Sequence, residues 1–444
     1  MTDTAQNNDT TAEDSSDELV VELKEWLGEN WDPELTVAEW WERLGTSGWG
    51  VPMWPVEWFG KGLSRNESVK VQTTITNYGA LPAPGGLGLL LAGPTITVHG
   101  SDEQKQQYLR EIVTGQKAWC QLFSEPGAGS DLAGLQTRAV KDGEEWIVNG
   151  QKVWTSGGQA ADLGMLIART DPDQPKHAGI TYFLIDMHQP GMDVRPLKEM
   201  TGRAMFNEVF ITDARVSDDA ILGGLGNGWR VANTTLMFER AGLGAGGGSA
   251  AVSLAMPGTV MGDLDKRAGD FVRSGGRQGA SAATMFGSGP KGLIEAAKNV
   301  GKDKDPVLRQ KLMGLYSLGE VARYNNLRLK AAMAAGKDIP GLPNIAKLSM
   351  SEMVRQSRDI SLSIAGPYGT LHAYDAESRK ALDAATGLPG LGAVTEAALF
   401  AQGPPIYGGT DQVQRNIIGE RVLGLPKEPG PAKDTPFKDL PKNG

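Results

Sequence analysis

Glu239 is a candidate proton acceptor, because it lies in a helical stretch of apolar and small side chains. Leu236, Met237 and Phe238 precede it, and small residues dominate Ala241–Ala251. Apolar surroundings disfavour the charged form of a carboxyl, so we expect a raised pKa, which suits a base working near neutral pH. An ordinary exposed helix glutamate is the alternative.

Three further segments combine small residues with hydroxyl and amide side chains. They are Ser124–Asp131 (SEPGAGSD), Asn149–Gly158 (NGQKVWTSGG) and Ile406–Arg415 (IYGGTDQVQR). Small residues let backbone N–H groups approach a phosphate or the edge of a flat ring closely. Thr410 and Gln412 open the last expected helix, where N–H groups and the helix dipole can hold an anion such as pyrophosphate. A simple N-cap is the alternative for Thr410.

The elements that must position these residues fall into three blocks. Apolar residues at helical spacing and a capping box at Ser64 and Glu67 predict helices up to about residue 117. Short strands follow, and Asn149-Gly150 predicts a two-residue hairpin turn in a compact antiparallel β domain. Helices are expected again over 229–255, 306–336, 343–364 and 411–423, and Ser274–Gly301, rich in Gly and Ser, is expected to be a mobile loop.

These patterns predict a domain order along the chain. We expect a disordered N-terminus over 1–16, an N-terminal helical domain over 17–117, a middle β domain over 118–225, a C-terminal helical bundle over 226–426 and a poorly ordered tail over 427–444.

Composition excludes several classes of protein. The chain has 444 residues and a net charge of −9 without a basic stripe, which argues against nucleic-acid binding. Cys120 is the single cysteine and the four histidines are scattered, so we expect no disulfide and no metal site. Long apolar runs are broken by Gly, Pro or charges, and the N-terminus has no apolar signal segment. We therefore expect a soluble cytoplasmic protein with no membrane span.

The order and spacing of the three segments resemble the acyl-CoA dehydrogenase family of flavin enzymes, over roughly residues 20–427. The resemblance implies an α+β fold with an N-terminal helical domain, a middle β-barrel domain and a C-terminal four-helix bundle. It also implies FAD, an acyl-CoA substrate, an electron-transfer flavoprotein as partner, a homo- or hetero-oligomer (dimer or tetramer), and a role in fatty acid or steroid degradation.

Such enzymes need a carboxylate base for the α-proton, while the β-hydrogen leaves as hydride to flavin N5. The family's usual glutamate, in a Tyr-Glu-Gly-Thr segment, is replaced here by Gly408. A subset similar to isovaleryl- and long-chain acyl-CoA dehydrogenases carries the base before an arginine on the first bundle helix. Glu239, followed by Arg240, stands at that place, so the resemblance assigns Glu239 as the catalytic base.

The resemblance carries further roles over residue by residue. The implied cofactor-binding residues are Gln121, Phe123, Ser124, Gly129, Ser130, Trp154, Ser156, Thr410 and Gln412. The implied substrate-binding residues are Ser130, Arg240, Gly408 and Gly409. Ser156 is expected to donate to N5, with a hydroxyl that caps its own turn as the alternative. Trp154 is expected on the ring face, with a barrel-core tryptophan as the alternative. A surface ion pair is the alternative for Arg240.

The chain also departs from the family pattern. The Arg-x-x-Phe-Gly segment that reaches a neighbouring subunit's FAD has no clear match, Arg273 and Arg277 being the nearest residues. The family's glutamine and Gly-Gly-Asn-Gly turn are replaced in Ser363–Gly369, and the stretch from there to Tyr407 is longer. These departures resemble divergent actinobacterial dehydrogenases for bulky acyl-CoAs such as steroid side chains.

Two other functions stay open at this point. One is a non-catalytic FAD-binding subunit of a heteromeric complex, and the other is a flavin oxidase or monooxygenase on the same fold. A GxGxxG match at Gly242–Gly247 follows no strand and lies within an expected helix, so we do not interpret it as a dinucleotide site. The missing side chain at Gly408 and the small residues after Glu239 predict a bulky or branched acyl group.

Overall fold

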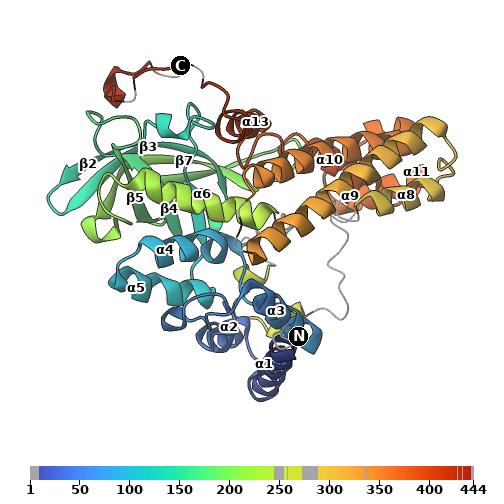
Figure 1. The fold of residues 1–444 in the computed structure, drawn as a ribbon, viewed down its shortest axis with the longest axis horizontal. Helices are drawn as coiled ribbons and strands as arrows, with labels where there is room; N and C mark the ends of the chain where they lie inside the picture. The colour runs from blue at the N-terminus through green and yellow to red at the C-terminus, as the bar shows by residue number, and fades with distance from the viewer. Residues whose placement is uncertain are drawn as a thin grey trace, which may run out of the picture.

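The chain forms a curled sheet flanked by helices, with further helices that project away from it (Figure 1). The computed structural model describes residues 10–244, 255–257, 259–272, 289–335, 337, 339–427, 429–432 and 434–441. In its described part, no helix is both long and apolar enough to cross a membrane. The architecture confirms the expected α+β fold with helical regions on either side of a β region.

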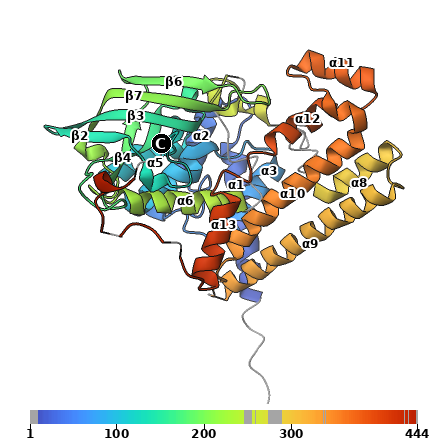
Figure 2. The same ribbon diagram turned by 90° about the horizontal axis from the view of Figure 1, so that it is seen from above.

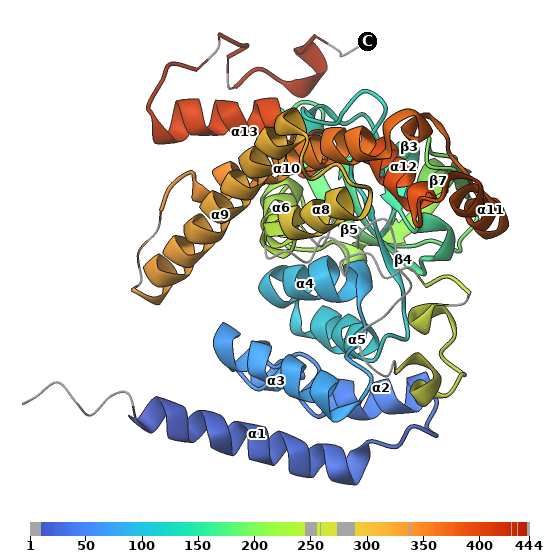
Figure 3. The same cartoon turned by 90° about the vertical axis from the view of Figure 1, so that its right-hand side faces the viewer.

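The N-terminal region is a group of helices that lies on one side of the sheet (Figures 1 and 3). These helices are α1 (Thr10–Asn30), α2 (Val37–Thr46), α3 (Arg65–Tyr78), α4 (Gly93–His99) and α5 (Asp102–Val113). The capping box that Ser64 and Glu67 predict is present at the start of α3. Helix α1 begins at Thr10, inside the stretch 1–16 that composition predicted to be disordered; residues 1–9 lie outside the described residues.

The middle region is a mixed sheet. Its strands in the described chain are β1 (Trp119–Leu122), β2 (Arg138–Asp142), β3 (Glu145–Ser156), β4 (Leu163–Arg169), β5 (Ile180–Asp186), β6 (Met192–Leu197) and β7 (Phe206–Ser217). The order is β1-β4-β2-β3-β7-β6, and β5 pairs with β4. Most pairs are antiparallel as expected, but β4 pairs in parallel with β1 and β2. The purely antiparallel prediction was therefore wrong, because local alternation carries no information about strand partners.

The hairpin predicted at Asn149-Gly150 is also wrong. Strand β3 runs straight through both residues, and the turn lies earlier, at Gly143. A Cβ at Gly150 would come within 2.3 Å of Thr137 Oγ1, so close packing explains this glycine. Asn149 and Asp213 exchange hydrogen bonds of 2.9 and 3.1 Å across a bulge between β3 and β7. Asn149-Gly150 is therefore part of a strand and not of a turn.

The C-terminal region is helical. Its described helices are α6 (Gly228–Gly244), α8 (Gly289–Asn299), α9 (Pro306–Ala334), α10 (Leu342–Ala365), α11 (Ala376–Thr386), α12 (Leu391–Phe400) and α13 (Asp411–Ile417). The four expected helices are present over their described residues, although α6 is followed only to Gly244. Helix α8 occupies part of the stretch 274–301 that was predicted to be a mobile loop, and that prediction was wrong there, because burial of Leu293 and Ala297 in a core shared with α9 stabilises a helix. Residues 274–288 of that stretch lie outside the described residues. Helices α11 and α12 fill the long stretch before Tyr407.

The tail after α13 returns to the sheet (Figure 2). Its short helical turn Phe437–Asp439 lies on the loop that joins β4 to β5, with a hydrogen bond of 2.9 Å from Phe437 N to Gln174 O. This part of the tail therefore lies against the sheet, a contact that composition cannot show, and the poorly ordered tail stays a prediction.

Candidate active site

Helix α6 lies between α4 and the sheet, and this packing sets the direction of its side chains (Figure 1). Thr235 is fully buried, with its Oγ1 3.1 Å from Thr95 Oγ1 and 3.2 Å from the Tyr182 hydroxyl. Glu239 follows four residues later and so shares the inward face of the helix. The buried threonine thereby fixes the rotation that turns the Glu239 carboxyl towards the interior.

The structure brings Glu239 together with Gln121, the first residue of the expected flavin segment. Gln121 Nε2 donates to Glu239 Oε2 over 3.5 Å, and both side chains are half-buried. The partners come from strand β1 and helix α6, which belong to different regions of the chain. The expected base and the expected cofactor strand therefore meet at one place.

The segment after β1 is held in a tight loop. Glu125 and Ala128 exchange backbone hydrogen bonds of 3.1 and 3.0 Å, and Ser124 O accepts from Val153 N of β3 at 2.9 Å. Gly129 and Ser130 then lie exposed, and a Cβ at Gly129 would meet no atom within 4 Å. Since the fold itself leaves space at Gly129, this position can admit a bound molecule close to the backbone.

A buried ion pair, which the sequence interpretation missed, supports this loop. The Lys152 side chain is completely buried, and its Nζ donates to Glu125 Oε1 at 2.9 Å and to Phe123 O at 3.0 Å. Glu125 also accepts from the backbone N–H groups of Gln136 and Thr137 at 2.6 and 2.9 Å. Burial alone would raise the pKa of Glu125, but the Lys152 ammonium and these donors outweigh it and lower the pKa. The Glu125 carboxylate is therefore the charged form that these donors stabilise, while burial, only partly offset by Glu125, lowers the pKa of Lys152.

Trp154 is displayed on the surface rather than packed in the sheet. Its side chain is 61% exposed, and its φ of +61° lies in the left-handed region that bulky residues rarely adopt. The register between β3 and β7 shifts between Lys152 and Thr155, which places this conformation in a bulge. An exposed ring on a strained backbone fits a surface for a flat ligand better than a core tryptophan. Ser156 is half-buried directly after this bulge.

The Tyr407–Thr410 turn is organised by Gln414. Gly408 and Gly409 both have positive φ, at +62° and +79°, and Gln414 Nε2 donates to their carbonyl oxygens at 3.1 and 3.3 Å. Thr410 Oγ1 accepts from Val413 N at 3.1 Å, so Thr410 is an N-cap of α13, and Gln412 is exposed. Gln414 Oε1 also accepts from Asn344 Nδ2 of α10 at 2.7 Å, and α10 packs against α6.

Asp411 anchors this turn, and the sequence interpretation gave it no role. Its side chain is 4% exposed and pairs with Lys347 Nζ and Arg355 Nη1 of α10, each at 2.9 Å. Burial acts to raise the pKa of Asp411, but hydrogen bonds from Lys347 and Arg355 lower it overall. The sequence contains the opposite charges of these ion pairs, but they are far apart along the chain, and a single sequence does not show which residues pair.

We predict that Asp411→Asn lowers the free energy of unfolding by about 3 kcal/mol, because two cations of α10 lose their buried partner. Thermal or urea unfolding measures the loss. Asp359→Asn is the matched control, since Asp359 makes an exposed pair with Arg358 at 2.8 Å and should change stability by less than about 1 kcal/mol. Equal stability of the two variants would contradict this anchoring role.

One expected site residue is only partly described: Arg240 lies in α6, but its side chain falls outside the described residues. Arg273 and Arg277 lie wholly outside the described residues. Among the described residues, no group of three His, Cys, Asp or Glu side chains could hold a metal ion.

Comparisons with known proteins agree with this geometry. Models of the acyl-CoA dehydrogenase N-terminal, middle and C-terminal domains match residues 5–116, 120–214 and 293–423. Acyl-CoA dehydrogenase IpdE1 of Mycobacterium tuberculosis is 33% identical over 390 residues, which cover 88% of each chain. Its namesake in Mycolicibacterium smegmatis is 31% identical over 439 residues, covering 93% of this chain and 98% of the relative.

Solved structures give the same result. A variant of the Tcur3481-Tcur3483 steroid ACAD superposes with a TM-score of 0.67 at 25% identity, covering 93% of this chain and 99% of that one. The ChsE4-ChsE5 complex from Mycobacterium tuberculosis gives 0.64 at 25% identity, with 96% and 100% covered. The family models and these relatives therefore define the class of protein, a flavoprotein oxidoreductase. The chain belongs to the acyl-CoA dehydrogenase family.

Proposed function

We propose that this chain catalyses the FAD-dependent α,β-dehydrogenation of an acyl-CoA thioester, with Glu239 as the base and an electron-transfer flavoprotein as electron acceptor. The contact of 3.5 Å between Gln121 and Glu239 carries the proposal, because it joins the base to the cofactor strand. Glu239 takes the α-proton on a carboxylate oxygen, and the Gln121 amide, as a hydrogen-bond donor, orients that carboxylate.

The described residues fit a flavin. The exposed Trp154 ring offers a flat apolar surface, and Gln121, Ser124 and Ser156 are half-buried. The hydrogen bond from Val153 N to Ser124 O joins the strand of Trp154 to the loop after β1. The open position at Gly129 lets backbone groups come close to a ligand. FAD, when bound, supplies the hydride acceptor at N5. In this proposal the Ser156 hydroxyl donates to N5, while Ser130 and Gly408 border the acyl-CoA.

We further propose a bulky or branched acyl group. Gly408 leaves the usual position of the base without a side chain, and structural relatives at 25% identity include a protein described as a steroid ACAD. Fewer atoms beside the reacting carbons leave more volume for the substrate.

The test is anaerobic bleaching of the purified yellow protein by a panel of straight-chain, branched and steroid acyl-CoAs. We expect bleaching, with the fastest reduction by a branched or steroid thioester. Fastest reduction by straight chains would overturn the substrate assignment alone. A colourless protein, or a yellow one that no thioester bleaches, would favour a non-catalytic subunit, and peroxide release that matches turnover would favour an oxidase.

We also propose that the chain works as an oligomer. Helix α9 exposes Met313, Tyr316, Tyr324 and Leu327 at spacings that place them on one face. Large apolar side chains gathered on one face mark an interaction surface. Figure 1 shows that α9 projects from the body of the chain, and the exposure of these four side chains leaves them available for contact with a second chain. Native mass spectrometry of the purified protein decides between a homo-oligomer and a chain that requires a different partner.

A further inference from the structure

The C-terminal segment Pro436–Leu440 makes specific contacts with the loop that joins β4 to β5. Phe437 N and Lys438 N donate to Gln174 O and Pro172 O at 2.9 and 3.0 Å. The Lys438 ammonium pairs with Asp173 at 2.5 Å. Two backbone hydrogen bonds in consecutive residues fix the orientation of the segment as well as its position.

Phe437 covers a buried arginine. The ring centroid lies 3.6 Å from Cζ of Arg169, whose side chain is almost completely buried at the end of β4. Burial lowers the pKa of Arg169 to about 10, which leaves it charged at neutral pH. A desolvated guanidinium gains from the negative face of an aromatic ring. The ring therefore compensates part of the cost of burying this charge.

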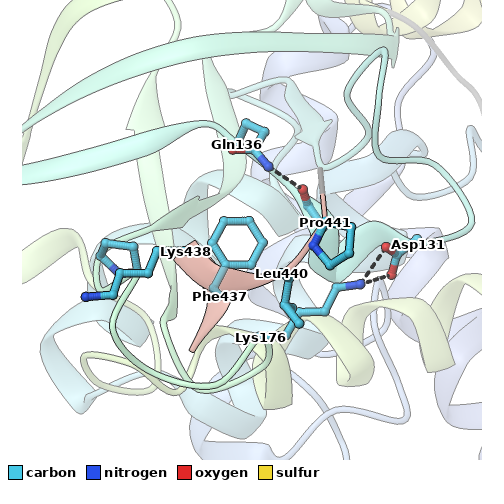
Figure 4. Close-up of a pocket in the computed structure, with 9 residues that line it drawn as sticks. Asp131, Gln136, Lys176, Phe437, Lys438, Leu440 and Pro441 are labelled. Atoms are coloured by element: carbon cyan, nitrogen blue, oxygen red, sulfur yellow. Dashed lines mark hydrogen bonds and ion pairs between the residues drawn. The ribbon is translucent and has the colours of Figure 1, made fainter. Parts of the chain in front are cut away.

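Arg169 in turn ties two loops together. Its Nη1 donates to Lys176 O and its Nη2 donates to Ala133 O, both at 2.7 Å. The Lys176 ammonium contacts both carboxylate oxygens of Asp131 at 2.6 and 2.5 Å. Figure 4 shows Phe437 among the residues that line a pocket between the C-terminal segment and these loops, with Lys176 reaching to Asp131.

We propose that Pro436–Leu440 is a clamp that positions the acyl-CoA loop, with Phe437 as a positioning residue that acts through Arg169. The acyl-CoA loop is defined as residues 130–133, which contain Ser130, Asp131 and Ala133. The inference rests on the proposed function, because that function assigns Ser130 to the acyl-CoA. A loop that is held in place before binding loses less conformational freedom when the substrate arrives.

The test compares Phe437→Leu, which keeps an apolar side chain without the ring, with Phe437→Tyr, which keeps the ring. We expect the leucine variant to raise the KM for acyl-CoA about tenfold, as the loss of a desolvated cation–π contact implies. Its kcat should stay near that of the wild type, because the loop binds the ground state and the transition state alike. The tyrosine variant should behave like the wild type.

Hydrogen exchange of the backbone amides in residues 131–137 and 172–176 gives a second readout that needs no substrate. We expect faster exchange in Phe437→Leu than in Phe437→Tyr, confined to these loops. Unchanged exchange and unchanged KM in the leucine variant would overturn the clamp. The clamp would also be overturned if both variants showed a lower kcat, a raised KM and a lower thermal stability together, because that result indicates a packing role alone. If no acyl-CoA bleaches the wild type, the proposed function fails, while the exchange comparison still decides the clamp.

Discussion

Glu239→Gln is expected to slow flavin reduction by acyl-CoA by about three orders of magnitude. The amide keeps the shape of the side chain and its place beside Gln121, but it cannot accept the α-proton. Anaerobic stopped-flow measurement of flavin bleaching gives the rate. The yellow colour should remain, because Glu239 acts on the substrate and the expected cofactor residues are unchanged.

The matched control is Glu295→Gln on α8, where the glutamate is exposed and pairs with Lys298 at 2.7 Å. That variant should reduce its flavin at the wild-type rate. Glu239→Asp adds a geometric control, because it keeps the carboxylate but withdraws it by one methylene. Bleaching by Glu239→Gln at a rate close to the wild type would remove Glu239 as the base.

Lys152→Met is expected to lower the free energy of unfolding by about 3–5 kcal/mol, because it leaves the Glu125 carboxylate buried without its cation. The variant should also release FAD more readily, since the Glu125 carboxylate accepts from the N–H groups of Gln136 and Thr137 and so closes the loop that contains Gly129 and Ser130. Urea unfolding and the flavin content of the purified protein measure the two effects.

Two variants check the cause of that loss. Lys141→Met removes an exposed pair with Asp218 and should change stability by less than about 1 kcal/mol. Lys152→Met combined with Glu125→Gln should be more stable than Lys152→Met alone, because the second change removes the uncompensated charge. A double variant that is no more stable than the single one would show that packing, not charge, dominates at this site.

The same pair predicts a dependence on pH. The pKa of Glu125 is lowered in the folded protein, so the pair contributes stability above the unfolded pKa of about 4.3. That contribution is lost as the pH falls through the lowered folded value. The stability difference between wild type and Lys152→Met should therefore shrink towards acidic pH.

Sequence reasoning located the elements whose signals are local. The capping box at Ser64 and the helical spacing around Glu239 depend on residues within one or two turns, so a single sequence displays them. The replacement of the usual base by Gly408 was also visible, because a substitution within a short sequence motif can be read from the sequence alone. The roles assigned to the cofactor-binding and substrate-binding residues stay predictions.

The features that the sequence did not reveal depend on contacts between distant segments. Gly150 of β3 faces Thr137, the residue before the neighbouring strand β2, which local turn preferences cannot show. Lys152 and Asp411 look like ordinary surface charges until the fold buries them with their partners. The contact of Phe437 with Arg169 joins the C-terminal segment to the sheet, whereas composition indicated disorder there.

The contact between Gln121 and Glu239 has a consequence for the time course of folding. The two residues are 118 positions apart, and closing a chain loop of that length costs entropy that is recovered only after α6 has docked on the sheet. Sheet structure can therefore form while the carboxylate still lies away from β1. During refolding from denaturant, the β signal should return before catalytic competence, and the interval between the two is the time that α6 needs to dock.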